Sequence, residues 1–229
     1  MSDNNTTRRE FVERMTAGAI AAGMGSAVPL TAAAGMTAPT VKPDMAWLNG
    51  VKGAHAQLFV SPTPGAIPFL HVLNYVDTFK EAFGQSYPQV IAIVGLFGMA
   101  IPLGVNDAMW AKYNLGAATN VNDKATKAAA SVNVFAKPAA GGLLGVDAGF
   151  DVPGTASIAS LQARNVRFIL CNNALNFWVG RLAAGSGGNV ATIRNDLVAN
   201  MLPGITIVPA MVIAINQAKE AGASYMHNG

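Results

Sequence analysis

Short apolar runs punctuate the chain, and each is bounded by Pro, Gly, Asn or Ser. Such runs occupy 55–60, 89–96, 167–171 and 205–209 and are rich in Val, Ile, Leu and Phe, which is typical of β-strands. The run from Gln89 to Leu96 contains almost no polar residue, so we expect that strand to be buried on both faces. Residues 224–227 are expected to add a short edge strand.

Between these runs, apolar residues recur every three or four positions. This spacing predicts a helix over 66–83 and further helices over 106–115, 172–184, 189–201 and 211–221. Several of these segments begin after Asn or Asp, which are suited to cap a helix. Strands that alternate with helices predict an α/β domain of three layers, α/β/α, in which helices cover both faces of a mostly parallel sheet of about five strands.

The segment 116–155 breaks this alternation. It is rich in Ala, Gly and Asn and shows no lasting periodicity. A stretch of this length without regular structure inside a compact domain is usually a lid, a binding loop or disordered. We therefore expect an α/β domain over 54–229 with a flexible insertion at 116–155 that forms a mobile flap over the site.

The amino-terminal residues have the features of a targeting segment. Thr7-Arg8-Arg9-Glu10-Phe11-Val12 resembles the twin-arginine consensus, and a weakly hydrophobic stretch follows it, ending in three alanines at 32–34. Residues 1–34 are thus expected to be a twin-arginine signal peptide, 35–53 a linker, and the protein periplasmic. An amphipathic helix with a chance Arg-Arg pair is the alternative.

Composition narrows the class of protein. Hydrophobic residues make up 52% of the chain and charged residues 12%, which excludes a disordered chain. Gly and Pro interrupt the longest apolar run, so no stretch reaches the about 18 residues that a membrane span requires, and we expect no stable membrane insertion once the signal is removed. The few charges favour a homo-oligomer that buries part of its surface between subunits.

The sequence contains no motif for most common kinds of binding or catalytic site. The net charge is +3 with basic residues scattered along the chain, so we expect no nucleic-acid binding. His55, His71 and His227 are far apart and lack metal-ligand spacing, and the glycine-rich 185–188 segment lacks the Lys-Ser/Thr of a phosphate loop. We therefore expect no metal and no cofactor, and the absence of a dinucleotide or haem motif weakens the case for a redox enzyme.

Cys171 is the exception. This sole cysteine ends an apolar strand and immediately precedes a predicted helix, and ligand sites of parallel α/β sheets collect at the carboxyl ends of the strands. The free N–H groups and dipole of a helix start favour an anion, and so favour thiolate, which attacks or accepts sulfur. Free Cys is also among the residue types most often buried as small apolar side chains, and position alone does not choose between these roles.

The carboxyl-terminal part of the chain resembles the DsrE-like sulfur-relay family. The resemblance rests on Leu161-Gln-Ala-Arg-Asn-Val-Arg-Phe-Ile-Leu-Cys-Asn-Asn-Ala-Leu175, on Leu202-Pro-Gly-Ile-Thr-Ile-Val-Pro-Ala210 and on a last helix that closes with Gly-Ala-Ser-Tyr225. It covers about residues 54–228 and is strongest after Leu161. The insertion at 116–155 is longer than compact family members carry. The resemblance implies a three-layer α/β/α domain, a homo-oligomer, and Cys171 as the sulfur carrier.

Four further residues are candidates to bind a ligand near Cys171. Asn172 and Asn173 lie at the predicted helix start, and Asn106 and Lys112 follow the second strand, from which they could reach the same edge of the sheet. Lys112 would stabilise an anionic sulfur species, or would simply be a solvated lysine on a helix surface. The leading hypothesis is an exported protein that binds or transfers sulfur through Cys171, as a persulfide or mixed disulfide, with a donor or acceptor protein as partner. The alternative is a non-catalytic ligand-binding or assembly module with a structural cysteine.

Overall fold

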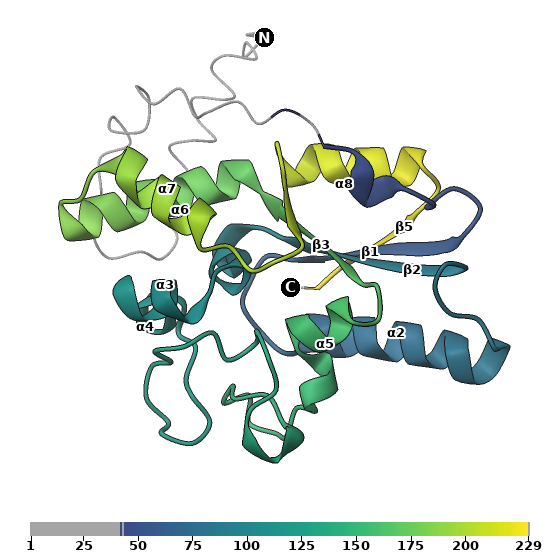
Figure 1. The fold of residues 1–229 in the computed structure, drawn as a ribbon, viewed down its shortest axis with the longest axis horizontal. Helices are drawn as coiled ribbons and strands as arrows, with labels where there is room; N and C mark the ends of the chain where they lie inside the picture. The colour runs from purple at the N-terminus through teal and green to yellow at the C-terminus, as the bar shows by residue number, and fades with distance from the viewer. Residues whose placement is uncertain (1–41, 43, 229) are drawn as a thin grey trace, which may run out of the picture. The chain divides into compact units, whose positions relative to one another are not determined.

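The described part of the computed structural model, residue 42 and residues 44–228, forms an α/β domain (Figure 1). The expected signal peptide and the first residues of the expected linker lie outside the described residues. The strands are β1 (His55–Ser61), β2 (Val90–Leu96), β3 (Arg167–Cys171), β4 (Ile205–Val208) and β5 (Ser224–His227). They form one parallel sheet in the order β4-β3-β2-β1-β5.

Helices cover both faces of this sheet. The α-helices are α2 (Ile67–Phe83), α3 (Asp107–Lys112), α4 (Leu115–Thr119), α5 (Ile158–Gln162), α6 (Asn172–Ser186), α7 (Val190–Ala199) and α8 (Met211–Glu220), and the 3-10 helices are η2 (Ala46–Leu48), η3 (Gly98–Gly104), η4 (Ala140–Gly142) and η5 (Gly154–Ala156). Helices α2 and α5 lie below the sheet in Figure 1, whereas α6, α7 and α8 lie above it. The expected three-layer α/β/α fold with a five-stranded sheet is therefore confirmed.

The sheet forms because its central strands are almost entirely apolar. All seven residues of β2 are buried, and β2 pairs along its whole length with β1, in a register that sets Leu58 beside Ile93. Alternate side chains of β1 and β3 point to the α2 layer, where Phe59 packs edge-on against Tyr75 and Phe168 packs against Phe69. Burial of these side chains on both faces stabilises the domain.

All strands are parallel, so their carboxyl ends lie at one edge of the sheet. The chain that leaves β2 returns to β3 through α5 on the lower face, whereas the chain that leaves β3 enters α6 on the upper face (Figure 1). Neighbouring strands whose connections diverge in this way leave the crevice in which α/β proteins bind ligands. Here η3 follows β2 at this edge and is held to α6 by a hydrogen bond of 2.8 Å from the Trp178 indole N–H to the Gly98 carbonyl.

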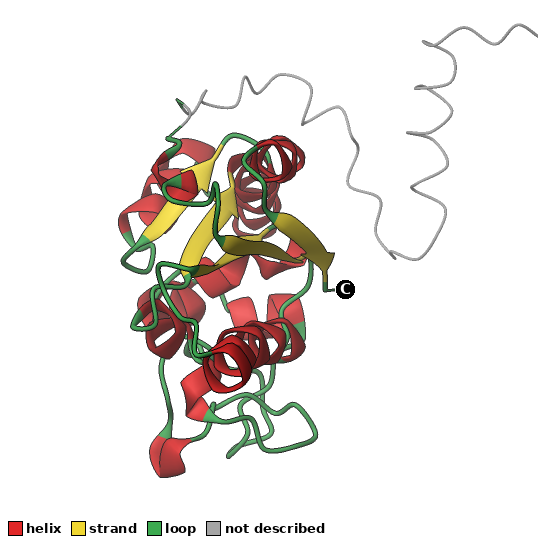
Figure 2. Cartoon of the chain, turned by 90° about the vertical axis from the view of Figure 1, so that its right-hand side faces the viewer, coloured by secondary structure: helices red, strands yellow, loops and turns green. Residues whose placement is uncertain are grey.

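The insertion at 116–155 is mostly loop (Figure 2) but it is packed. Isolated antiparallel bridges join Asn122 to Ala129 and Leu143 to Pro153. The Phe135 side chain is fully buried, with its ring centroid 5.8 Å from that of Phe69 in α2. The insertion thus contributes a buried side chain to the core next to α2. The expected mobility of the insertion stays a prediction.

Two local features differ from the expected boundaries. The helix expected over 106–115 is divided, because Asn114 adopts a left-handed conformation with φ 48° between α3 and α4, which Asn tolerates better than most residues. Within the expected linker, Trp47 is 4% exposed and Val51 fully buried, and the Arg167 guanidinium donates a hydrogen bond of 2.9 Å to the Trp47 carbonyl. Packing of the domain therefore extends back to Trp47.

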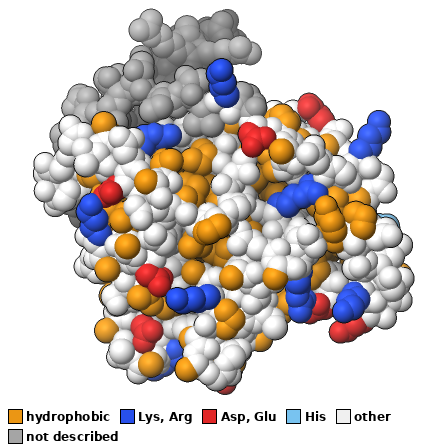
Figure 3. Space-filling view, in the orientation of Figure 1, with side chains coloured by type: hydrophobic (Ala, Val, Ile, Leu, Met, Phe, Trp, Pro, Cys, Tyr) orange, Lys and Arg blue, Asp and Glu red, His pale blue; other side chains and the backbone are white. Residues whose placement is uncertain are grey.

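The surface carries dispersed charges. On the face seen in Figure 3, Lys and Arg side chains are scattered among acidic and apolar ones rather than gathered in one area. Of the helices in the part of the chain that the structure describes, none combines the length and hydropathy needed to cross a membrane.

Candidate functional site

Cys171 lies at the carboxyl end of β3, at the residue that caps α6. Its backbone is extended, with φ −72° and ψ 116°, and α6 begins at the next residue. The side chain is 5% exposed, as expected for the last residue of a strand buried at every position after its first. The structure therefore places Cys171 at the junction of a strand and a helix, as predicted.

A second helix reaches the sulfur atom. The backbone N–H of Met211, the first residue of α8, donates a hydrogen bond of 3.3 Å to the Cys171 Sγ. Sγ thus lies between the amino-terminal ends of two helices, α6 with 15 residues and α8 with 10. Each end carries a partial positive charge, so together they favour negative charge at this position.

Gly95 in β2 sets the position of α8. An added Cβ at Gly95 would lie 2.7 Å from the Sδ of Met211, closer than side chains normally approach. The missing side chain therefore lets the Met211 thioether lie directly on the sheet, and Met211 is 2% exposed. This contact holds the first turn of α8 where its N–H group can reach Sγ.

Of the two predicted asparagines, Asn172 is buried and Asn173 is exposed. They are the first two residues of α6. Asn172 is 4% exposed, and its Oδ1 accepts a hydrogen bond of 2.7 Å from the Nη2 of Arg194. Both predicted residues therefore lie next to Cys171 along the chain, and Asn172 links it to α7.

Arg194 is the residue that sequence reasoning missed. It lies in the middle of α7, is partly buried, and also donates a hydrogen bond through Nη1 to the Oδ1 of Asn176, one turn after Asn172 in α6. Burial lowers the pKa of this guanidinium. No sequence motif identifies Arg194 as part of the site, because only the packing of α7 against α6 brings its guanidinium to these two asparagines.

Asn106 and Lys112 have other partners. The Asn106 side chain caps α3 by accepting a hydrogen bond of 3.3 Å from the Met109 N–H, and it donates one of 3.0 Å to Asn200 Oδ1. The Lys112 ammonium contacts the carboxylate of Asp196 in α7 and is half exposed. Within the described residues, no hydrogen bond joins either side chain to Cys171.

Asp196 receives two side chains of the α3 segment. The Tyr113 hydroxyl donates a hydrogen bond of 2.7 Å to the Oδ2 that Lys112 also contacts. The hydrogen bond from Lys112 lowers the pKa of the Asp196 carboxyl, and the same bond raises the pKa of Lys112. These three side chains hold α3 against α7, so the structure gives Lys112 the role of a surface ion pair.

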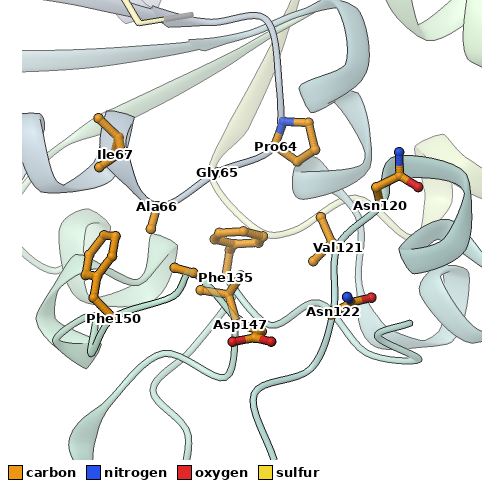
Figure 4. A pocket seen from close by; sticks show the side chains of 12 residues that line it. Pro64, Gly65, Ala66, Ile67, Asn120, Val121, Asn122, Phe135, Asp147 and Phe150 are labelled. Atoms are coloured by element: carbon orange, nitrogen blue, oxygen red, sulfur yellow. The ribbon is translucent and has the colours of Figure 1, made fainter. Parts of the chain in front are cut away.

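A separate pocket lies between the loop after β1 and the insertion (Figure 4). Its volume is about 250 Å³, and the end of the loop after β1, from Pro64 to Ala66, forms one wall together with Ile67, the first residue of α2. The insertion forms the opposite wall, where Figure 4 shows Phe135, Asp147 and Phe150. Because its lining mixes aromatic and polar groups, this pocket could hold a small organic molecule.

The histidines do not converge. His55 packs its ring on Phe79 at 5.0 Å, His71 hydrogen bonds with Asn228 and His227 with Tyr225. Among the residues that the structure describes, no three His, Cys, Asp or Glu side chains come together as a set that could hold a metal ion.

No model of a known protein family matches the chain, and no curated protein matches its sequence. The resemblance to the DsrE-like family therefore rests on the residues around Cys171, on the Leu202–Ala210 segment and on the last helix closing with Gly-Ala-Ser-Tyr225.

Proposed function

We propose that the protein carries sulfur on Cys171 as a persulfide, in the manner of the DsrE-like family that it resembles. The observation that supports this most strongly is the hydrogen bond from the Met211 N–H to Sγ at the meeting point of two helix starts. Backbone N–H groups at such positions stabilise anionic sulfur. They do so without a metal or a cofactor.

The chemistry needs no added oxidant. The Cys171 sulfur attacks the outer sulfur of a donor persulfide, the donor S–S bond breaks, and a new S–S bond forms on Cys171. The donor leaves as a thiol and takes up the proton that Cys171 gives up. Passing the outer sulfur to an acceptor thiol is the same exchange in reverse, so donor and acceptor proteins are the partners that this proposal requires.

The low exposure of Cys171 sets a condition on this proposal. At 5% exposure a donor cannot reach Sγ without a local opening of the structure. The first turn of α8 is the element to open, because its Met211 N–H donates to Sγ and its next two side chains, Val212 and Ile213, are exposed. Local openings of single helix turns occur well below the free energy of global unfolding.

Sulfur loading tests the proposal directly. The folded protein is incubated with cysteine persulfide, freed of small molecules, and treated with cyanide, which releases persulfide sulfur as thiocyanate. We expect close to one thiocyanate per chain for the wild type and none for Cys171→Ser, in which the hydroxyl keeps an acceptor for the Met211 N–H. A wild type that stays unloaded while folded would contradict the proposal.

The pocket between the loop after β1 and the insertion favours a second candidate function, that of a ligand-binding module in which Cys171 is only packed. The observation for it is the cavity of about 250 Å³ with aromatic and polar lining. Filling the pocket by Ala148→Leu would then abolish ligand-induced stabilisation in a thermal-shift screen of small molecules. It would leave sulfur loading of Cys171 unchanged, so the two candidates are separable.

We also propose that the protein is exported to the periplasm by the twin-arginine pathway. This proposal rests on the Thr7–Val12 motif and on the apolar stretch after it. Replacing Arg8 and Arg9 together by Lys should keep the protein in the cytoplasm, as judged by cell fractionation. Unchanged export of that variant would contradict this route.

A further inference from the structure

The side chains around Arg194 contain more hydrogen-bond donors than acceptors. The Nη1 of Arg194 donates one hydrogen bond to Asn176, and the Nη2 donates one to Asn172. A guanidinium carries five N–H groups, so its Nε–H and one N–H on each Nη have no acceptor within the described residues. The Nδ2 of Asn176 is buried and likewise has no partner among these residues. Because a buried donor without an acceptor costs free energy, the Asn176 Nδ2 favours an acceptor at this point, and the described residues do not supply one.

Within the part of the chain that the structure describes, Arg194 also has no counter-ion. Its two hydrogen-bond partners are neutral amides, and no carboxylate pairs with it among residues 44–228. The neighbouring acid on α7, Asp196, already binds Lys112 and Tyr113. Burial lowers the pKa of Arg194, the effect expected of a guanidinium that has lost water without gaining an anion.

We propose that Arg194 and Asn176 form a binding site for a small oxoanion between α6 and α7. Two oxygen atoms of one anion match the planar fork of a guanidinium, and a third would accept from the Asn176 Nδ2. Asn172 and Asn176 hold the guanidinium in place by accepting from its two Nη atoms. The site is joined to Cys171 through Asn172, the next residue, and its existence does not depend on whether Cys171 carries sulfur.

Replacing the anion by a built-in carboxylate tests this proposal. Asn176→Asp places a negative charge next to Arg194 with almost no change in shape and removes the buried Nδ2 donor. We expect this variant to have a higher melting temperature than the wild type and to bind oxoanions at least about tenfold more weakly. Asn195→Asp is the matched control, because it adds the same charge one residue from Arg194 at an exposed position.

The measurement is isothermal titration with sodium sulfate in a chloride buffer of constant ionic strength, without any sulfur donor. Saturable sulfate binding by the wild type and Asn195→Asp, lost in Asn176→Asp, would support the site. Three results would overturn it: no sulfate binding by the wild type, equal binding by Asn176→Asp, or equal loss in both variants. Failure of the persulfide assay would leave this result unaffected, because the titration does not involve the thiol.

Discussion

At the scale of single residues, the Cys171 sulfur accepts one backbone hydrogen bond, which comes from Met211, forty positions later in the chain. Met211 plays two parts, since its N–H donates to Sγ and its thioether packs on Gly95. These parts can be separated by substitution. Met211 is the first residue of α8, the one helical position at which Pro fits without breaking a helix.

Met211→Pro should therefore weaken the reactivity of Cys171 while α8 stays folded. The residue before it, Ala210, is already extended with φ −153° and ψ 142°, as a following Pro requires. Loss of the N–H should lower the equilibrium extent of sulfur loading by about ten- to a hundredfold once α8 has closed again, since a hydrogen bond to a charged group contributes about 1.5–3 kcal/mol. The comparison is Met211→Ala, which loses the thioether but keeps the N–H; equal extents of loading for both variants at equilibrium would count against the role of the N–H.

The residues of the site were predictable to different degrees. The position of Cys171 follows from a local pattern, an apolar run followed by Asn-Asn, and that pattern also places Asn172. The donor Met211 and the cation Arg194 lie on other helices, and only the packing of α8 on Gly95 and of α7 on α6 brings them close. Lys112 looked suited to an anion, but its nearest anion is the Asp196 carboxylate, a long-range pairing that no sequence spacing announces.

At the scale of elements, one helical glycine is required by close packing and another is not. An added Cβ at Gly116 in α4 would lie 2.2 Å from the Ala130 carbonyl oxygen, a backbone atom that cannot turn aside, whereas one at Gly180 in α6 meets nothing within 4 Å. Gly116→Ala should lower the free energy of unfolding by about 3 kcal/mol or more. Gly180→Ala should raise it by about 0.5–1 kcal/mol through helix propensity. Urea unfolding measures both, and a tolerated Gly116→Ala would refute the packing of the insertion described above.

The contact between α3 and α7 should depend on pH. The pKa of Asp196 is lowered in the folded state by its hydrogen bond from Lys112, so its contribution to stability is present above the ordinary carboxyl pKa. It is lost as the pH falls through the lowered value. Asp196→Asn should therefore be less stable than the wild type at neutral pH and equal to it in strong acid, with a small difference because the pair is at the surface. A difference that persists in acid would contradict this origin.

The strands were predicted almost residue by residue, because central strands of a parallel sheet are continuous β-branched and apolar runs. The helix over 106–115 was not, since one Asn in the left-handed region at 114 ends α3 after six residues. The short η3 and α5 were also missed. The short helix η3 packs against α6, and the connection that contains α5 packs against α2. These contacts, rather than a hydrophobic periodicity in the sequence, determine the conformation of both segments.

At the scale of the whole molecule, exposed apolar side chains bear on assembly. Phe83, Phe177, Val212 and Ile213 are each at least half exposed, in a chain with few charges. We expect the protein without residues 1–34 to sediment as a homo-oligomer at micromolar concentration, because association would cover such side chains. A monomer over that range of concentration in analytical ultracentrifugation would contradict the expectation.

A sulfur carrier at Cys171 requires above all that the thiol can be reached without unfolding of the domain. The direct measurement is the rate at which iodoacetamide alkylates Cys171 as urea is raised within the native range. Local opening of the first turn of α8 exposes little surface, so the account predicts a rate that barely depends on urea and far exceeds the rate expected from global unfolding. A rate that rises with urea as steeply as global unfolding would show that the thiol is sealed in the core, and would contradict the proposed sulfur carrier.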